Sequence, residues 1–235
     1  MSKNYQIKLM SAAERTGVQF VMAHLYLAAR EVLTLVVHLF NAHFLSRKYR
    51  KLVELKVNFG CGPKYKSGWL NIDFYEGSDL RLDLRKNLPL PDECCSLCYS
   101  EHFFEHLSFP DDANRHLSEC KRILTSGGEL HIGVPNAGSA MLSYAKIHNE
   151  GRLDDAFTRY WAHPNWVNTR MEAINFLFRQ NYLWFDHQHM WAYDFLSLKL
   201  MLERCGFINV KQRDFDPTLD SENRKGGLYV CATKP

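Results

Sequence analysis

The sequence lacks a strong charge of either sign. Its 235 residues include 29 basic and 26 acidic side chains, which leaves a formal net charge of only +3. A domain that binds nucleic acid needs a basic surface to meet the phosphates, so this balance argues against a nucleic-acid partner. The one dense basic segment is Arg47-Lys48-Tyr49-Arg50-Lys51, which fits either a solvated surface or a contact with phosphate or lipid.

The cysteines lack a pattern typical of disulfides or of zinc. Their number, seven, is odd, and several stand inside apolar runs, which is typical of buried free thiols in a reducing compartment. Cys95 and Cys98 are spaced like a zinc-binding pair, but no second pair of cysteines or histidines follows at a matching distance. We therefore expect a cytoplasmic protein and predict no metal site.

The N-terminus lacks the pattern of a secretory signal, because its first residues are polar and no cleavage site follows an apolar core. Residues 16–45 are nevertheless apolar at helical spacing. Arg30 and Glu31 divide them into two arms of about 14 residues, shorter than the roughly 20 that span a bilayer. Two interpretations stay open. Either one or two helices pack on the domain or on a partner subunit, including a second copy in a homodimer, or residues 16–51 make a peripheral contact with the inner face of a membrane.

From residue 55 onward, short apolar runs alternate with helical patterns. The expected strands cover 55–59, 69–73, 80–84, 96–100, 129–135, 207–215 and 228–233, and the expected helices cover 111–124 and 195–204. Ser126-Gly127-Gly128 is expected to stop the first of these helices. This alternation predicts an α/β fold whose parallel sheet is covered by helices on both faces.

The segment between the fifth and sixth expected strands is too long to be a simple connection. Residues 137–192 are irregular and rich in aromatic residues and histidine. They are expected to form a functional insertion or lid, whose aromatic rings would stack on or cover a ring-bearing or sugar ligand. The predicted organisation is an N-terminal helical extension over 1–50 and one domain over 51–235 that contains this insertion.

A glycine turn directly follows the first expected strand. Gly60-Cys61-Gly62-Pro63 exposes backbone N–H groups and lets a ligand approach closely. Asp73 ends the next expected strand and is placed to accept hydrogen bonds from two ribose hydroxyls, as in nucleotide sites at the carboxyl ends of parallel strands. Only 13 positions separate Gly60 from Asp73, so little or no helix fits between these strands.

Several motifs accompany this turn in a fixed order. They are Val57-Asn58-Phe59-Gly60-Cys61-Gly62-Pro63, Gly68-Trp69-Leu70-Asn71-Ile72-Asp73, Leu88-Pro89-Leu90-Pro91-Asp92, Tyr99-Ser100-Glu101-His102-Phe103-Phe104-Glu105-His106-Leu107, Arg122-Ile123-Leu124-Thr125-Ser126-Gly127-Gly128, Val134-Pro135-Asn136 and Leu202-Glu203-Arg204-Cys205-Gly206-Phe207. Together they resemble the class I S-adenosylmethionine-dependent methyltransferases, in particular a compact bacterial type. The resemblance covers residues 55–235.

This resemblance implies a Rossmann-like, seven-stranded, mostly parallel sheet with an antiparallel last strand, and S-adenosylmethionine as cofactor. It implies that Gly60, Cys61, Gly62 and Pro63 face the methionine part and that Asp73 holds the ribose. It further places Asp83 and Leu84 near the adenine, and Ser100 and Glu101 beside the methionine and the acceptor. The family's third glycine is missing, since Lys64 and Tyr65 follow Pro63. The cofactor loop is therefore expected to be open on one side, and the N-terminal helix is a candidate to cover it.

Methyl transfer from a sulfonium is an in-line displacement, and a hydroxyl acceptor must lose a proton. The candidate bases lie in two clusters, Glu101, His102, Glu105 and His106 in one and Asp186, His187 and His189 in the other. The four histidines suit the role best, because histidine titrates near neutral pH. His102 and His106 lie at the end of the fourth expected strand, each beside an acid, and His187 and His189 lie late in the insertion. Each also fits a structural role, and the pair His187 and His189 alone is two ligands short of a metal site.

The resemblance points to an O-methyltransferase for a sugar, a glycan or glycolipid precursor, or a small metabolite. Two alternatives stay open: a scaffold protein that binds the cofactor without turnover, which the apolar N-terminal segment would suit, and a protein methyltransferase. A nicotinamide-dependent oxidoreductase is disfavoured, because it requires Gly-x-Gly-x-x-Gly followed by a full helix.

Overall fold

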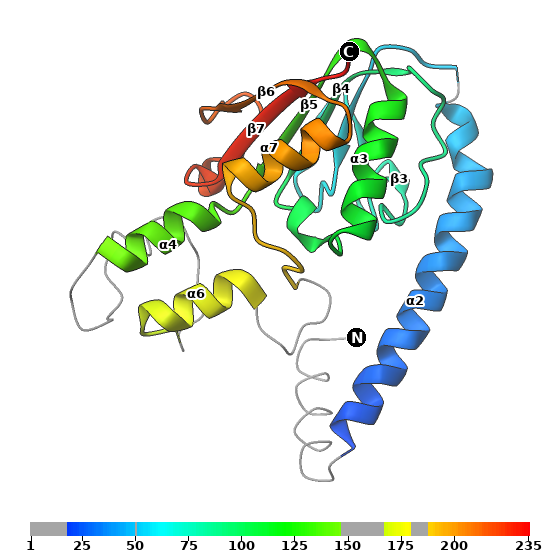
Figure 1. Cartoon of the computed structure of the whole chain (residues 1–235). Coiled ribbons are helices and arrows are strands. Elements are labelled where there is room, and N and C mark those ends of the chain that lie inside the picture. Colours follow the sequence, from blue (N-terminus) through cyan, green and yellow to red (C-terminus); the bar gives the residue numbers. More distant parts are fainter. Residues whose placement is uncertain (1–17, 50, 147–166, 180–187) are drawn as a thin grey trace.

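The computed structural model describes residues 18–49, 51–146, 167–179 and 188–235. Its centre is a seven-stranded sheet in the order β3-β2-β1-β4-β5-β7-β6 (Figure 1). The strands are β1 (Leu55–Phe59), β2 (Leu70–Asp73), β3 (Leu80–Arg81), β4 (Cys95–Glu101), β5 (Leu124–Val134), β6 (Ile208–Arg213) and β7 (Leu228–Thr233). Strand β7 runs antiparallel to both its neighbours, and the other pairs are parallel. The predicted Rossmann-like α/β fold is confirmed.

Two helices lie in front of the sheet in Figure 1. They are α3 (Asp111–Ile123) and α7 (Phe195–Arg204). Helix α3 buries one side, with Ala113, Leu117 and Cys120 at three- to four-residue spacing. Helix α7 begins at a capping box, in which the Asp194 carboxylate accepts from the backbone N–H of Ser197. The described part of the chain also contains three short 3₁₀ turns: η1 (Leu45–Lys48), η2 (Phe104–His106) and η3 (Glu222–Arg224).

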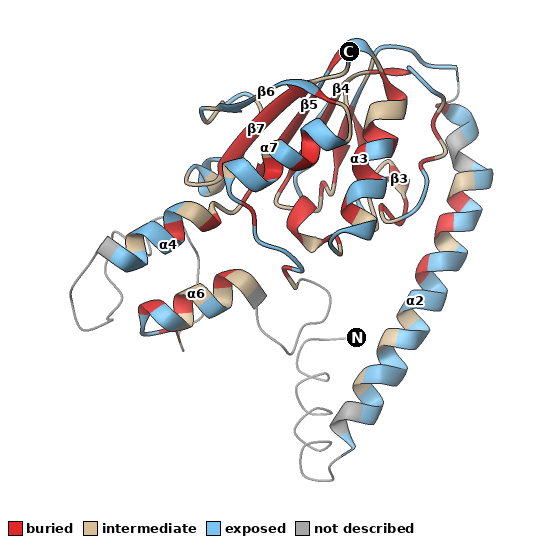
Figure 2. Cartoon of the chain, in the orientation of Figure 1, coloured by how far each residue is buried: buried red, intermediate tan, exposed pale blue. Residues whose placement is uncertain are grey.

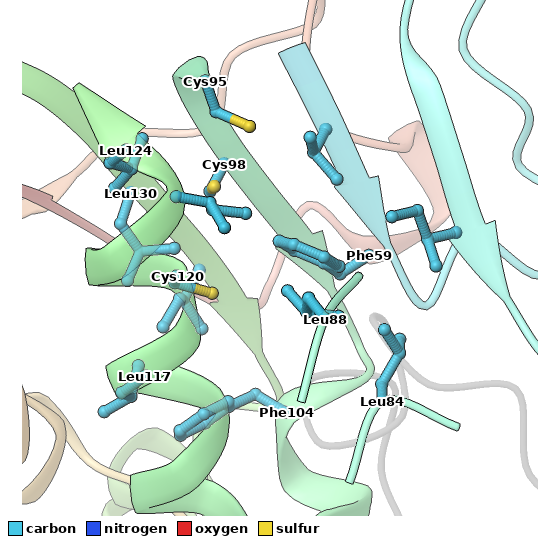
Figure 3. Close-up of a cluster of buried hydrophobic side chains, with 14 of the residues drawn as sticks. Phe59, Leu84, Leu88, Cys95, Cys98, Phe104, Leu117, Cys120, Leu124 and Leu130 are labelled. Atoms are coloured by element: carbon cyan, nitrogen blue, oxygen red, sulfur yellow. The ribbon is translucent and has the colours of Figure 1, made fainter. Parts of the chain in front are cut away.

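The main core lies between the sheet and α3. Figure 3 shows Phe59 from β1, Cys98 from β4 and Leu117 from α3 within this cluster, and each is fully buried. Cys95 and Cys120 lie in the same apolar layer. All seven cysteines are free thiols, and Cys94 joins Cys95, Cys98 and Cys120 as a buried member of this core.

The prediction of helices on both faces is wrong for the described residues. Loops cover the other face of the sheet, because residues 60–69 form turns and no helix between β1 and β2. Lys66 from this loop lies 4.5 Å above the ring of Tyr99 and donates to the carbonyl oxygen of Leu219. The Tyr99 hydroxyl donates to Asp220 at 3.0 Å, and Asp220 also pairs with Arg213. The short spacing between β1 and β2 thus gives this face a polar and aromatic cover.

The insertion begins and ends at adjacent points. Asn136 and Tyr193 form an isolated parallel bridge directly after β5. The two described helices between them, α4 (Ala137–Lys146) and α6 (Arg170–Arg179), contact each other and lie beyond the carboxyl ends of the parallel strands (Figure 1). This part of the chain is therefore placed on the edge of the sheet where nucleotide sites form.

One long helix precedes the sheet. Helix α2 (Gln19–His43) is continuous through Arg30 and Glu31, so of the one or two helices that the sequence left open the structure has one, and the two short arms form a single segment. Arginine and glutamate are both good helix formers, which accounts for the continuity. Its segment Val21–His43 is long and apolar enough to cross a membrane by length and composition, although only 11 % of the tested window is buried. Figure 2 shows α2 exposed along most of its length.

A buried carboxylate fixes the loop between β3 and β4. Glu119 on α3 accepts hydrogen bonds from the backbone N–H of Leu88 at 2.6 Å and from the Arg122 guanidinium at 2.8 and 2.9 Å. Arg122 also donates to the carbonyl oxygens of Leu88 and Leu90. Burial opposes ionisation of Glu119, but the hydrogen bonds from Arg122 and Leu88 outweigh it and hold the pKa of this carboxyl below its usual range.

We expect Glu119→Gln to lower the unfolding free energy by about 3 kcal/mol at pH 7, because Arg122 loses a charged partner. A carboxyl whose pKa is lower in the folded state stabilises fully above its unfolded pKa, near 4.3, and loses this contribution as the pH falls through the folded value. Urea unfolding at pH 7 and at pH 3 measures both effects. The difference between wild type and variant should shrink at pH 3, and an unchanged difference would contradict the assigned role.

Candidate functional site

The glycine turn after β1 holds the acid at the end of β2. Gly60 and Gly62 have φ angles of +62° and +47°, which favour glycine. The backbone N–H of Gly62 donates to Asp73 Oδ2 at 2.6 Å, and the N–H of Tyr75 donates to Oδ1 at 3.1 Å. The carboxylate of Asp73 is therefore fixed at the carboxyl edge of the sheet, as the sequence predicts for a ribose-binding acid.

Phe103 closes the space above this turn. A Cβ atom on Gly60 would lie 2.3 Å from the Phe103 side chain, so only glycine fits there. Phe103 follows His102, whose φ of +53° turns the chain after β4. The sequence analysis did not single out Phe103, because its contact with Gly60 joins the ends of two different strands.

A cleft of about 280 Å³ opens beside Asp73. Its lining comes from the β2–β3 region, the η2 turn, helix α2 and the end of the insertion. The lining residues are Arg30, Glu31, Thr34, Asp73, Phe74, Leu82, Asp83, Leu84, Arg85, Phe103, His106, Leu107, Ser108, Asp112, Gln188 and Met190. Three predicted cofactor residues (Asp73, Asp83 and Leu84) and one predicted base (His106) thus meet in one cleft.

The other predicted cofactor residues lie outside this lining. Cys61 is buried, and burial together with the nearby Asp73 carboxylate raises the pKa of its thiol to about 12. Pro63 is exposed and Ser100 is buried. The Glu101 carboxylate accepts from the backbone N–H of Ser221 at 2.9 Å, and from its hydroxyl at 2.7 Å. Glu101 thus connects β4 to the C-terminal segment, and its place beside the acceptor stays a prediction.

Helix α2 forms one side of the cleft through polar side chains. Asn41 Nδ2 donates to the carbonyl oxygen of Arg81 at 2.8 Å, and the backbone N–H of Asp83 donates to His38 Nδ1 at 3.2 Å. Arg85 donates to Glu31 on α2 at 2.7 Å and to Asp83 at 2.8 Å. Burial opposes ionisation of Asp83, but hydrogen bonds from Arg85 outweigh it and hold the pKa of this carboxyl below its usual range. The N-terminal helix is therefore part of the cleft.

A cluster of histidines surrounds one buried carboxylate at the base of the insertion. Glu105 Oε1 lies 3.7 Å from His102 Nδ1, 3.7 Å from His189 Nε2 and 4.0 Å from His106 Nε2. Glu105 is 1 % exposed, and burial raises its pKa to about 8. Burial also lowers the pKa of His102 to about 3 and that of His189 to about 4. The structure thus brings together three of the four predicted histidines; His187 lies outside the described residues.

Backbone carbonyls orient two of these rings. His106 Nδ1 donates to the carbonyl oxygen of Gln188 at 2.9 Å, and His189 Nδ1 donates to that of Leu177 at 2.5 Å. Because a carbonyl can only accept, Nδ1 carries the proton in each ring and Nε2 presents a lone pair. Both lone pairs lie on the side of Glu105. Glu105 is a candidate base in the sequence, but nothing local shows that it is buried among histidines from two segments.

Comparison with known proteins finds a similar domain family and similar folds. Residues 64–132 match the model of a methyltransferase domain. No curated protein sequence matches the chain. Among solved structures, a complex of the Haloferax volcanii Trm112 methyltransferase activator with a methyltransferase is 14 % identical, with a TM-score of 0.46 over 88 % of this chain and 94 % of that one.

Two further structures have similar scores. A SAM-dependent methyltransferase from Thermotoga maritima is 16 % identical, with a TM-score of 0.43 over 88 % of this chain and 96 % of that one. The Haemonchus contortus phosphoethanolamine N-methyltransferase 2, in complex with phosphomonomethylethanolamine and S-adenosylhomocysteine, is 12 % identical, with a TM-score of 0.40 over 83 % of this chain. The match spans only 52 % of that chain. Identities this low do not indicate the acceptor.

Proposed function

Starting from the class I S-adenosylmethionine-dependent methyltransferase domain that this chain contains, we propose that the protein O-methylates a hydroxyl of a sugar or of a lipid-linked glycan precursor at a membrane surface. The observation that carries the proposal is the cleft in which Asp73 and His106 meet, with helix α2 along one side. In this polar cleft, the acid proposed to bind the ribose lies together with a candidate base.

The cofactor is proposed to lie along the carboxyl ends of β1 and β2. Asp73 would accept hydrogen bonds from both ribose hydroxyls, and the N–H groups of the Gly60–Gly62 turn would face the methionine part. The adenine would lie against Leu84 and the backbone of Asp83, between β3 and α2. The Asp83 carboxylate is already engaged by Arg85, so its contribution there is to hold the loop in place.

The acceptor is proposed to lie on the η2 side of the cleft. Of the three described candidate histidines, only His106 also lines the cleft. With the proton on Nδ1, its Nε2 would take up the acceptor's hydroxyl proton as the oxygen attacks the methyl carbon. The C–S bond breaks in the same step, and the cofactor leaves as S-adenosylhomocysteine.

The outer surface of α2 supports a membrane location for this reaction. Its domain-facing positions are polar, with Thr34, His38 and Asn41 all buried, whereas its apolar side chains face outward. Val21, Met22, Leu25, Tyr26, Val32, Leu33, Leu35, Val36, Leu39 and Phe40 are each 48–63 % exposed. A helix held on the domain by one polar side is not surrounded by lipid, so we propose that α2 lies in the interface and does not span the bilayer. The exposed Arg47 and Lys48 follow it and would meet anionic headgroups.

Two substitutions on α2 test the membrane contact. Val32→Glu with Val36→Glu should weaken binding to anionic vesicles about 100-fold, because burial of each valine contributes about 1.5 kcal/mol or more. The matched control is Met141→Glu with Leu142→Glu on α4, which changes two side chains of similar exposure. Vesicle co-sedimentation measures both. Equal binding of the two variants would exclude α2 as the contact.

A radiolabelled methyl group tests the acceptor class. Purified protein and methyl-labelled S-adenosylmethionine are incubated with extracted glycolipids, with soluble glycans and with a protein extract in parallel. The expected result is label in the glycolipid or glycan fraction. This label should withstand treatment with alkali, because a methyl ether is stable to alkali and a methyl ester is not. Label only in the protein fraction would replace the proposal with a protein methyltransferase, and binding of cofactor without any transfer would favour a scaffold.

A further inference from the structure

Two separate segments converge on the buried carboxylate of Glu105. Glu105 and His106 belong to the η2 turn after β4, and His189 lies at the end of the insertion. The backbone N–H of Met190 donates to the carbonyl oxygen of Glu105 at 2.7 Å and joins the two segments. One ligand-type atom from each of Glu105, His106 and His189 lies within 4.8 Å of the other two. This geometry is non-local and belongs to the folded chain.

The polar atoms in this cluster do not satisfy one another. Neither carboxyl oxygen of Glu105 has a hydrogen-bond partner among the described residues, although a buried polar group without a partner is costly. His189 Nε2, whose proton is on Nδ1, presents a lone pair to Glu105 Oε1 at 3.7 Å, which is beyond hydrogen-bond distance. A cation that displaces the carboxyl proton would lie between these two atoms and give both a partner.

We propose that Glu105, His106 and His189 bind a divalent transition-metal ion. Two imidazole nitrogens and one carboxylate oxygen form a ligand set used for Zn²⁺, with the remaining positions open, and imidazole favours transition metals over Mg²⁺ or Ca²⁺. Ligands about 2.1 Å from one ion stand roughly 3.4 Å apart in a tetrahedron, so the observed 3.7 and 4.0 Å need only small side-chain shifts. The Nδ1–H bonds of His106 and His189 to backbone carbonyls match the outer support of metal-binding histidines.

Space and further ligands are present around the cluster. A cavity of about 10 Å³ lies against Glu105 and His189, close to the minimum for one water molecule. His102 Nδ1 lies 3.7 Å from Glu105 Oε1 and is the nearest additional ligand. His106 lines the main cleft as well, so an open position of the ion would face the acceptor.

The metal gives the reaction a different route for the proton, and this part of the inference rests on the proposed function. An acceptor hydroxyl bound to the ion loses its proton to solvent more readily. Its oxygen then forms the new bond to the methyl carbon, the C–S bond breaks, and the electron pair stays on sulfur. In this enzyme form His106 is a metal ligand and no longer the base.

Metal binding is measured on the full chain without cofactor or acceptor. After treatment with a chelator, titration with Zn²⁺ by calorimetry and with Co²⁺ by visible absorption should each show one equivalent bound, and Mg²⁺ should not compete. Glu105→Gln and His189→Ala should each weaken Zn²⁺ binding by more than about 100-fold, since even outer-shell partners are worth roughly 10–100-fold. His24→Ala removes an exposed imidazole on α2 and should change nothing.

The outcomes separate this inference from the proposed function. Absence of binding in the folded wild type, or equal affinity in Glu105→Gln and wild type, overturns the metal site. Thermal melting of the metal-free proteins guards against misfolding, because Glu105→Gln replaces an unpartnered buried carboxyl with a neutral amide of the same size and should melt no lower than wild type. If metal binds but no glycan or glycolipid is methylated, the acceptor proposal fails alone. If His189→Ala loses the metal and keeps full turnover, His106 acts as the base and the ion has no role in catalysis.

Discussion

Replacement of Asp73 by alanine is expected to weaken the binding of S-adenosylmethionine by about 100- to 10,000-fold. A carboxylate that accepts two hydroxyl hydrogen bonds contributes roughly 1.5–3 kcal/mol for each charged bond, and every 1.4 kcal/mol is about tenfold in affinity. Asp73 also accepts from the N–H groups of Gly62 and Tyr75, so its loss loosens the glycine turn as well. Both effects act on the ribose and methionine ends of the cofactor.

Calorimetry with S-adenosylhomocysteine measures this loss, and two controls define its cause. Asp73→Asn keeps the size of the side chain and the contact with Gly62 but removes the charge, so it should lie between wild type and alanine. Glu76→Gln changes an exposed acid on the same loop and should bind as wild type does. Affinity within threefold of wild type in Asp73→Ala, in a protein of unchanged melting temperature, would show that the cofactor does not use this acid.

Removal of the N-terminal helix should be the second largest effect. A chain that starts at Lys51 loses His38, Asn41 and Glu31, which contact the β3 region and Arg85. The backbone N–H of Asp83 then loses its partner, and Leu82 and Leu84, now buried, become partly exposed. We expect cofactor affinity to fall by at least about tenfold, because an unpaired backbone group and exposed apolar surface each cost about 1–3 kcal/mol.

A point variant keeps this prediction testable if the truncated chain is insoluble. His38→Ala with Asn41→Ala leaves α2 in the chain and removes its two hydrogen bonds to the β3 region. Its cofactor affinity should fall in the same direction by a smaller factor. His43→Ala, at an exposed position near the end of the helix, is the control. Unchanged affinity in a folded truncated chain would show that α2 does not contribute to the cofactor site.

Elements with strong local signals were predicted with accurate boundaries. The expected strands 55–59 and 228–233 and the expected helix 195–204 agree with β1, β7 and α7. Gly60 follows the first of these strands, Gly227 precedes the last, and Asp194 caps the helix. Helix α3 ends at Ile123, however, and β5 begins at Leu124 and continues through Gly127 and Gly128. The prediction that these glycines stop the helix and precede the strand was wrong. Pairing of Leu124 with Cys95, and of the two glycines with Lys234, sets this boundary.

Strand β3 shows a second non-local effect. The sequence predicts a strand over 80–84, but the ladder ends at Arg81. Two residues later, the backbone N–H of Asp83 donates to His38 on α2, so a residue 45 positions away takes the place of a strand partner. No local pattern contains this information.

The candidate site divides in the same way. The glycine turn, Asp73 and the histidines are short motifs, and they were found as such. The contribution of α2 to the cleft, the contact of Phe103 with Gly60 and the burial of Glu105 depend on segments that meet only in the fold. The burial of Glu105 changes the chemistry of the site most, since an isolated acid–histidine pair becomes a carboxylate enclosed by three imidazoles.

The two sides of α2 have a thermodynamic consequence. One side lines the cofactor cleft, and the other exposes the apolar surface proposed to meet lipid. If contact with a bilayer holds the helix against β3 and so raises the affinity for cofactor by some factor, the bound cofactor must raise the affinity for the bilayer by that same factor. Enzyme loaded with S-adenosylmethionine would then gather at the membrane, and enzyme that has lost its product would be released first.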